Sequence, residues 1–224
     1  MSDARLPAHI SVAAKGDRRA RDWCVRAVDS YTHATLAHGG PRYSGSRFDD
    51  VAASDPDRIT PGDLLAVTML DVAVPADAVI RFLGPAADHI TSLLTDVRAD
   101  VDLHEVDVKE VANSSKAGKL WTYLRAWNRP DPGTGPTTTS KLLARKRPRL
   151  LPIWDRVVGE QLGLRDHRDH WREVHELLQD RGLVELLSTT RSEARVDGLA
   201  LLRVLDILLW MSDTLRYDGP EYSS

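Results

Sequence analysis

The sequence predicts an all-α protein, and three observations lead to this prediction. Apolar residues recur at three- and four-residue steps in most segments, which is the period of an amphipathic helix. The segment Thr60-Pro61-Gly62-Asp63 combines an N-cap threonine, a proline at the first helical position and an aspartate in the first turn. The alternation typical of a strand occurs briefly at Val101–Val108, where the apolar residues break register midway, so a strand is the less favoured alternative there.

The N-terminal half is predicted to begin with a helix at Arg21–His33, whose apolar residues fall at mixed three- and four-residue steps. A loop rich in glycine, serine and proline follows, because this composition breaks a helix. The helix that begins at Thr60 continues through LLAVTMLDVAV, which is apolar on nearly all sides and is therefore typical of a buried core helix. Further helices are predicted at Ala76–Phe82, Pro85–Val97 and Lys116–Trp127.

The C-terminal half is predicted to be helical as well. Four helices are expected after the middle of the chain, at Pro136–Arg145, Asp155–Leu162, Arg168–Asp180 and Gly182–Leu187. The last helix, Val196–Met211, is apolar around most of its circumference, which indicates an interior position. We thus expect about nine or ten helices, with residues 1–20 as an N-terminal segment and residues 21–224 as a single helical domain.

Composition limits the class of protein. A chain of 224 residues, of which 42% are hydrophobic, can bury a substantial core. No segment approaches the roughly 18 consecutive apolar residues that span a bilayer, and the N-terminus lacks the apolar core of a signal peptide, so we expect a cytoplasmic protein without a membrane span. Cys24 is the one cysteine of the sequence, which excludes an internal disulfide and a cysteine-ligated metal or iron–sulfur cluster. We expect Cys24 to be a small core residue.

The segment Pro132–Trp154 is strongly basic, although the chain as a whole has a net charge of −3. It contains no acidic residue and five basic ones: Lys141, Arg145, Lys146, Arg147 and Arg149. A concentrated positive segment in an acidic chain indicates an anionic partner, and these side chains suit contacts with nucleic-acid phosphates. The alternatives are a solvated charged face and a surface for an acidic protein partner.

The same segment opens with a Gly-Thr-Gly-Pro turn at residues 133–136, which predicts a tight reversal followed by a new helix. Gly133 and Gly135 allow the main chain to approach a ligand closely. The free main-chain amides at the start of the helix, with the hydroxyls of Thr137 and Thr138, favour an anion-binding site. An ordinary loop between two helices is the alternative.

Together these residues resemble the helix-hairpin-helix of the endonuclease III-like DNA glycosylase superfamily, and adenine-glycosylase-like members in particular. In that superfamily a Leu-Pro-Gly-Val-Gly hairpin precedes a helix, a short apolar run and a catalytic aspartate. The matching parts here are Pro132–Gly135, the helix through Ser140–Leu143, and the run Leu151–Trp154, which ends at Asp155. Three positions that are apolar or small in the superfamily are polar in this chain: Asp131, Thr134 and Thr139.

The resemblance implies a two-lobed helix-hairpin-helix architecture with the hairpin at about residues 120–146, double-stranded DNA as the partner, and a role in DNA repair. It implies that Asp155 is the catalytic carboxylate, which stabilises the oxocarbenium-like sugar as the base leaves. A helix N-cap is the alternative role for Asp155, and the two roles are compatible. Bifunctional members carry a lysine at the position of Thr137, so the chain resembles a monofunctional N-glycosylase, for which no cofactor is expected. Lys141 lies one helical turn further on and is the less favoured amine nucleophile.

A non-catalytic helix-hairpin-helix module for DNA binding or damage sensing is the alternative function. The chain is also similar to an uncharacterised actinobacterial family with the signature KLLARKRPRL-Pro-apolar-aromatic-Asp, which has no function to carry over. Two further segments are weaker candidates. His167, His170 and His175 suit a metal by residue type, but their spacing does not put all three on one helix face, so an amphipathic helix is favoured. The loop Arg42–Phe48 has basic and aromatic residues that suit base stacking, although an ordinary surface loop is favoured.

Overall fold

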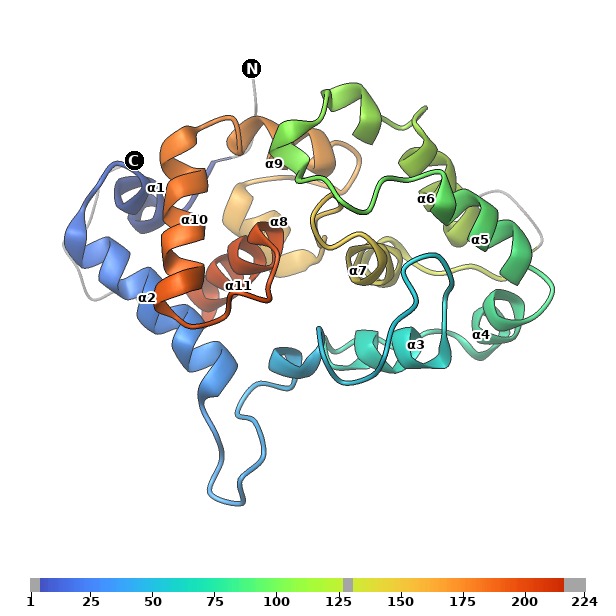
Figure 1. The fold of residues 1–224 in the computed structure, drawn as a ribbon, viewed down its shortest axis with the longest axis horizontal. Helices are drawn as coiled ribbons and strands as arrows, with labels where there is room; N and C mark the ends of the chain where they lie inside the picture. Colours follow the sequence, from blue (N-terminus) through green and yellow to red (C-terminus); the bar gives the residue numbers. More distant parts are fainter. Residues whose placement is uncertain (1–4, 127–130, 216–224) are drawn as a thin grey trace. The chain divides into compact units, whose positions relative to one another are not determined.

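The computed structural model describes residues 5–126 and 131–215, and in this part of the chain the protein is all-α, as the sequence predicts (Figure 1). The described residues form α-helices and short 3-10 helices, with two isolated β-bridges and no strand. The segment Val101–Val108 is not a strand. It contains a 3-10 helix at Leu103–Glu105, and a second 3-10 helix begins at its last residue and spans Val108–Val111. The described part of the chain divides into two compact units, of which unit 1 comprises residues 5–43 and 155–215 and unit 2 comprises residues 44–126 and 131–154.

Unit 1 is assembled from both ends of the chain. Its helices are α1 (Ala8–Ala14), α2 (Arg18–His33), α8 (Arg156–Leu162), α9 (His170–Leu177), α10 (Arg181–Glu193) and α11 (Leu201–Thr214). Helix α11 packs against α2, α8 and α10, and most of its residues are buried, so the predicted interior position of the last helix is confirmed. Cys24 on α2 is fully buried, and burial raises the pKa of its thiol to about 12.

Helix α1 lies within the expected N-terminal segment of residues 1–20. It packs against α2 and α10 inside unit 1. Ile10 and Ala13 of α1 are fully buried. The segment AHISVAA has too few residues to display a helical period, which is why the pattern did not indicate this helix.

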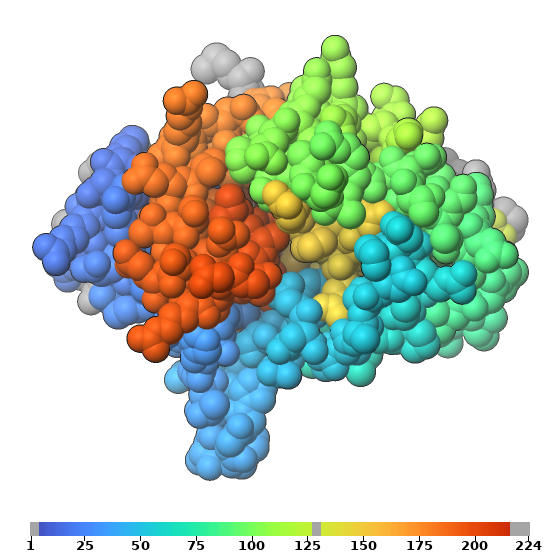
Figure 2. Space-filling model, in the orientation of Figure 1, coloured from blue at the N-terminus to red at the C-terminus, as the bar shows by residue number. Residues whose placement is uncertain are grey.

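A narrow finger formed by residues 34–42 projects from unit 1 after α2 (Figures 1 and 2). The amide of Leu36 donates to the carbonyl of Gly40, and the amide of Arg42 donates to the carbonyl of Ala34. Tyr43, at the base of the finger, stacks on Tyr31 with ring centroids 5.4 Å apart.

Unit 2 contains the basic segment and the helices around it. Its helices are α3 (Pro61–Thr68), α4 (Ala76–Leu83), α5 (Ala87–Thr95), α6 (Lys116–Arg125) and α7 (Pro136–Lys146), with a 3-10 turn at Ser44–Arg47. Of these, α7 lies within the basic segment. Helix α3 begins as predicted, since Thr60 and Asp63 form a reciprocal capping box, but it ends at Thr68, well before the end of the apolar run. Helix α7 packs against α3 and α6. The basic segment therefore lies among other elements of unit 2 and not on an isolated hairpin.

Candidate nucleic-acid interface

The predicted hairpin joins α6 to α7. Helix α6 ends at Arg125, and its C-cap residue, Ala126, adopts the left-handed conformation (φ 48°). Trp127 and the three residues after it lie outside the described residues. The chain is described again from Asp131, and the amide of Thr134 donates to the carbonyl of Leu124 at 3.2 Å. Gly135 is the N-cap of α7 and Pro136 its first helical residue, as the sequence predicts. The end of α6 and the start of α7 are thus held together by a main-chain hydrogen bond.

Gly133 and Gly135 differ in whether the surrounding structure requires a glycine. A Cβ on Gly133 would lie 2.2 Å from the carbonyl oxygen of Arg125, so any larger residue would push the turn away from the end of α6. Gly135 has an ordinary φ of −65°, and a Cβ there would meet no atom of the described residues within 4 Å. The packing of unit 2 therefore explains the glycine at position 133 and leaves the one at position 135 unexplained. Gly135 is also exposed, so its main chain is open to a ligand.

The start of α7 offers main-chain donors next to Gly135. No side chain caps this helix, and Pro136 has no N–H to donate. The amide of Thr139 donates to the carbonyl of Gly135 at 2.9 Å, so the amides of Thr137 and Thr138 precede the regular bonding pattern of α7. Thr137 is half-buried and Thr138 is 9% exposed.

The polar residues of the hairpin form a matched pair. The hydroxyls of Thr134 and Thr139 lie 2.7 Å apart, and both side chains are buried. Each hydroxyl therefore has a partner inside unit 2. This hydrogen bond joins the turn to α7.

Ser140 connects α7 to the end of unit 2. The amide of Trp154 donates to Ser140 Oγ at 2.9 Å, and the carbonyl oxygen of Trp154 lies 2.9 Å from the same hydroxyl. The carbonyl of Thr137 is also 2.9 Å away, so the hydroxyl proton has two acceptors. This fixes the main chain of Trp154 on α7, directly before the boundary between the two units.

Lys146 and Arg145 point into unit 2. The ammonium of Lys146 lies 2.7 Å from Asp63 Oδ2, and both side chains have no exposed surface. Arg145 Nη1 donates to the carbonyl of Phe48 at 2.8 Å, its Nη2 donates to the carbonyl of Ala52, and its Nε lies 3.5 Å from Asp63. Burial alone would raise the pKa of the Asp63 carboxyl, but hydrogen bonds from Lys146, Ser54 and Thr60 outweigh it, and the pKa is lowered.

Arg147 and Lys141 are likewise used inside unit 2. The guanidinium of Arg147 donates to the main-chain carbonyls of Val97, Pro56 and Leu94 and to the carboxylate of Asp57, and the side chain is 1% exposed. Lys141 donates to the carbonyl of Leu70 at 2.9 Å and is 5% exposed. The carbonyls bound by Arg145 and Arg147 include those of the irregular segment 48–57, whose main chain lacks the internal bonds of a helix.

This burial corrects the predicted phosphate contacts. Lys141, Arg145, Lys146 and Arg147 do not form an exposed basic surface, because acceptors of unit 2 occupy their charged groups. Arg149 is 43% exposed but forms a two-point ion pair with Asp102, with distances of 2.6 and 3.1 Å. The partners Asp57, Asp63 and Asp102 could not be recognised from the sequence, since they lie far from the basic residues along the chain and nothing local distinguishes them from other aspartates.

Asp155 is the N-cap of α8, so the structural role predicted for it is confirmed. Its Oδ1 accepts a hydrogen bond from the amide of Val158 at 2.9 Å, and the side chain is half-buried. This bond satisfies one of the amides that a helix start leaves open. The catalytic role of Asp155 stays a prediction.

The two weaker candidates are explained by packing. His170 and His175 are buried on α9, and among residues 5–126 and 131–215 no group of three or more histidine, cysteine, aspartate or glutamate side chains is placed to hold a metal ion. Phe48 is 1% exposed, and Tyr43 stacks within unit 1, so these aromatic rings are not presented for base stacking. In the described part of the chain no helix is long and apolar enough to cross a membrane.

The structure defines an all-α protein with a helix–turn–helix hairpin in one of two helical units. By sequence the chain belongs to a family of unknown function (DUF6308), whose model matches residues 24–213. No curated protein and no solved structure is similar enough to match.

Proposed function

We propose that this chain is a DNA-binding protein in which the main chain at the start of α7 holds a backbone phosphate. The observation that carries the proposal is Gly135, an exposed N-cap glycine that neither its backbone angles nor its packing requires. A residue without a side chain leaves room for a phosphate oxygen to approach the amides of Thr137 and Thr138. The positive end of the α7 dipole favours the same anion. The resemblance of this segment to the glycosylase hairpin supports the choice of DNA.

The binding mode differs from the one that the composition indicates. With Lys141, Arg145, Lys146 and Arg147 occupied inside unit 2, the phosphate contact rests on main-chain amides and threonine hydroxyls. Such contacts position a duplex but do not read its sequence. We therefore expect weak selectivity for undamaged sequences.

A pair of variants at position 135 tests this proposal. Aspartate and asparagine are about equally good N-cap residues, so Gly135→Asp and Gly135→Asn should both fold. Fluorescence anisotropy with a labelled duplex should show at least a tenfold loss of affinity for Gly135→Asp, because its carboxylate repels the phosphate, and a smaller loss for Gly135→Asn. Wild-type affinity in Gly135→Asp, with unchanged thermal stability, would overturn the proposal.

The resemblance extends the proposal to base excision by a monofunctional N-glycosylase, with Asp155 as the catalytic carboxylate. A carboxylate near the sugar lowers the barrier by stabilising the positive charge that develops as the base leaves. A duplex with a cationic azasugar at an abasic position mimics this charge without a choice of base. Preference for this duplex over an undamaged one, lost in Asp155→Asn, is the expected result. Asparagine keeps the α8 cap, so the comparison separates charge from folding.

A non-catalytic DNA-binding or damage-sensing module is the second candidate. The hydrogen bond from the Val158 amide favours it, because capping accounts for an aspartate at position 155 without chemistry. This candidate predicts that Asp155→Asn binds each of the two duplexes as tightly as wild type does.

A further inference from the structure

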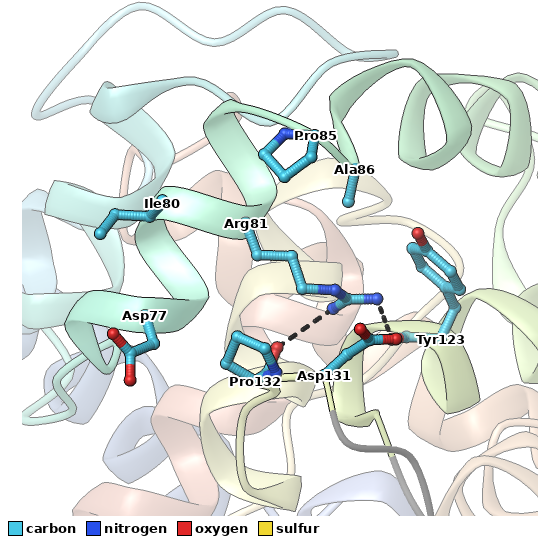
Figure 3. A pocket seen from close by; sticks show the side chains of 8 residues that line it. All are labelled: Asp77, Ile80, Arg81, Pro85, Ala86, Tyr123, Asp131 and Pro132. Carbon is cyan, nitrogen blue, oxygen red and sulfur yellow. Dashed lines mark hydrogen bonds between the residues drawn. The ribbon is translucent and has the colours of Figure 1, made fainter.

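A pocket of about 590 Å³ lies in unit 2, beside the hairpin but separate from the start of α7 (Figure 3). Its lining comes from α4, from the residues that follow it, from the end of α6 and from the described residues before Gly133: Asp77, Ile80, Arg81, Pro85, Ala86, Tyr123, Asp131 and Pro132. This volume is large enough to hold a small organic molecule. The expected DNA contacts involve none of these side chains.

Arg81 carries the only cationic group among these lining residues, and it is 6% exposed. Its Nη1 donates to the carbonyl of Pro132 at 3.3 Å and its Nη2 to the carbonyl of Tyr123 at 3.2 Å, while the guanidinium carbon lies 4.4 Å from the centre of the Tyr123 ring. Among the described residues no carboxylate lies within ion-pair distance of Arg81. A guanidinium has five N–H donors, so these two long bonds leave donors for a ligand.

A buried guanidinium without a carboxylate partner is unusual in this protein. Arg147, which is as deeply buried, has Asp57 at 2.9 Å, and buried Arg203 is paired with Asp206. Burial of a charge is costly unless an opposite charge or several hydrogen bonds compensate it. Two long hydrogen bonds and the Tyr123 ring compensate the charge of Arg81 only in part, so the site favours an anionic ligand. The planar fork of arginine matches a carboxylate.

The remaining lining restricts the ligand further. Ile80, Pro85, Ala86 and Pro132 present apolar surface, and Ile80 is 67% exposed. Asp77 and Asp131 are exposed carboxylates of the same pocket, and they repel a ligand with two negative charges more strongly than a ligand with one. Figure 3 shows the guanidinium between Pro132 and Tyr123, with Ile80 and Asp77 further along α4. The set is thus suited to one negative charge attached to an apolar body.

We propose that this pocket binds a small organic monocarboxylate, with the carboxylate on Arg81 and the apolar body against Ile80 and the prolines. This inference is independent of DNA binding. Benzoate serves as the probe, because it combines one carboxylate with an apolar ring. Benzyl alcohol, which lacks the charge, and inorganic phosphate, which lacks the apolar body, are the comparison ligands.

Calorimetric titration of the full chain tests the proposal. Benzoate should bind saturably with a Kd on the order of 1 mM or lower, and benzyl alcohol and phosphate should bind at least about tenfold more weakly. Ile80→Glu, which adds a third carboxylate to the pocket, should weaken benzoate binding about tenfold or more. Leu65→Glu is the matched control, because Leu65 is an exposed leucine on α3 outside the pocket. This variant should bind benzoate with the affinity of wild type.

Arg81→Lys keeps a positive charge but loses the planar fork, and we expect weaker benzoate binding. Arg81 also donates hydrogen bonds to the carbonyls of Tyr123 and Pro132, so the thermal unfolding of the Arg81→Lys variant is measured first. If this variant does not fold, the benzoate affinity of Ile80→Glu tests the proposal. The absence of saturable benzoate binding would overturn the proposal. Equal affinity for benzyl alcohol or phosphate, or an unchanged affinity in Ile80→Glu, would overturn it as well.

Discussion

The ammonium of Lys146 lies 2.7 Å from the carboxylate of Asp63, and both side chains are completely buried in unit 2. The same carboxylate accepts hydrogen bonds from the amide and hydroxyl of Thr60 and from Ser54, so it also caps α3. One aspartate therefore fixes the start of α3, the segment before it and the end of α7. Burial lowers the pKa of Lys146 and Asp63 opposes this shift, while the pKa of Asp63 is lowered by its hydrogen bonds despite its burial.

Replacement of Asp63 should destabilise the protein strongly. Asp63→Ala leaves the buried ammonium of Lys146 without its counter-charge and removes the capping box, so we expect a loss of about 3–5 kcal/mol in the free energy of unfolding. Guanidinium denaturation measures this loss. Asp50→Ala is the control, because the Asp50–Arg47 pair is exposed and should contribute less than about 1 kcal/mol. Equal stability of the two variants would contradict the structural role of Asp63.

The Thr134–Thr139 pair should behave as a coupled unit. Thr139→Val removes the hydroxyl that lies 2.7 Å from the buried hydroxyl of Thr134, which costs about 1–3 kcal/mol. The double variant Thr134→Val/Thr139→Val removes both hydroxyls and should be less destabilised than the sum of the single variants. A double-mutant cycle of unfolding free energies measures the coupling. Strictly additive values would mean that the hydrogen bond does not stabilise the hairpin.

The sequence predicts the all-α class and many helix starts because these depend on neighbouring residues. Thr60, Pro61 and Asp63 specify the start of α3 within four positions, and in the structure Thr60 is the N-cap and Pro61 the first helical residue, as predicted. Pro136 marks the start of α7 for the same reason. Helix ends are less well predicted: α10 continues to Glu193, six residues beyond its predicted end, because tertiary packing against α2 and α11 supports the added turns.

Whether the basic side chains are exposed or buried depends on partners that are distant in sequence, so it could not be predicted from neighbouring residues. Lys146 and Asp63 are 83 residues apart in sequence, and Arg147 binds carbonyls that any sequence would supply. A run of lysine and arginine has the same local pattern whether it faces solvent or fills a polar interior. The apolar neighbours Leu142 and Leu143, both fully buried, were the available signal that α7 is surrounded by other elements.

The stability of unit 1 should depend on the protonation of His9. Its Nε2 lies 2.9 Å from Ser212 Oγ, its ring packs edge-on against Trp23, and burial lowers its pKa to about 4. The unfolded chain takes up this proton near pH 6.5, so the contribution of neutral His9 is present above that pH and is lost as the pH falls towards 4. The slope from this group is at most about 1.4 kcal/mol per pH unit.

Denaturation at a series of pH values measures the effect of His9. His9→Gln should reduce the decline in stability between about pH 6.5 and pH 4. His33→Gln is the control, since His33 is an exposed residue of α2 paired with exposed Asp29. Identical pH profiles for wild type and His9→Gln would show that the ring is solvated.

Removal of the α8 cap should cause a small loss in the free energy of unfolding. Asp155→Ala removes the acceptor of the Val158 amide and should cost about 1 kcal/mol, whereas Asp155→Asn should lie within a few tenths of wild type. Thermal or chemical unfolding distinguishes the two variants. A large loss in Asp155→Asn would indicate that the carboxylate charge itself stabilises the fold.

Salt dependence separates main-chain phosphate binding from binding by a basic surface. Each phosphate neutralised by lysine or arginine contributes about −0.9 to the slope of log K against log salt concentration. Because the charges of Lys141, Arg145, Lys146 and Arg147 are occupied inside unit 2, we expect a slope no steeper than about −2 for a DNA duplex.

The variant Asp131→Asn removes an exposed carboxylate two residues before Gly133, so it should raise the affinity for DNA without changing the stability of the protein. Anisotropy titrations over a range of salt concentrations measure both effects. A slope near −5 would mean that about five cationic side chains reach phosphates, and an unchanged affinity in Asp131→Asn would place the duplex away from the hairpin.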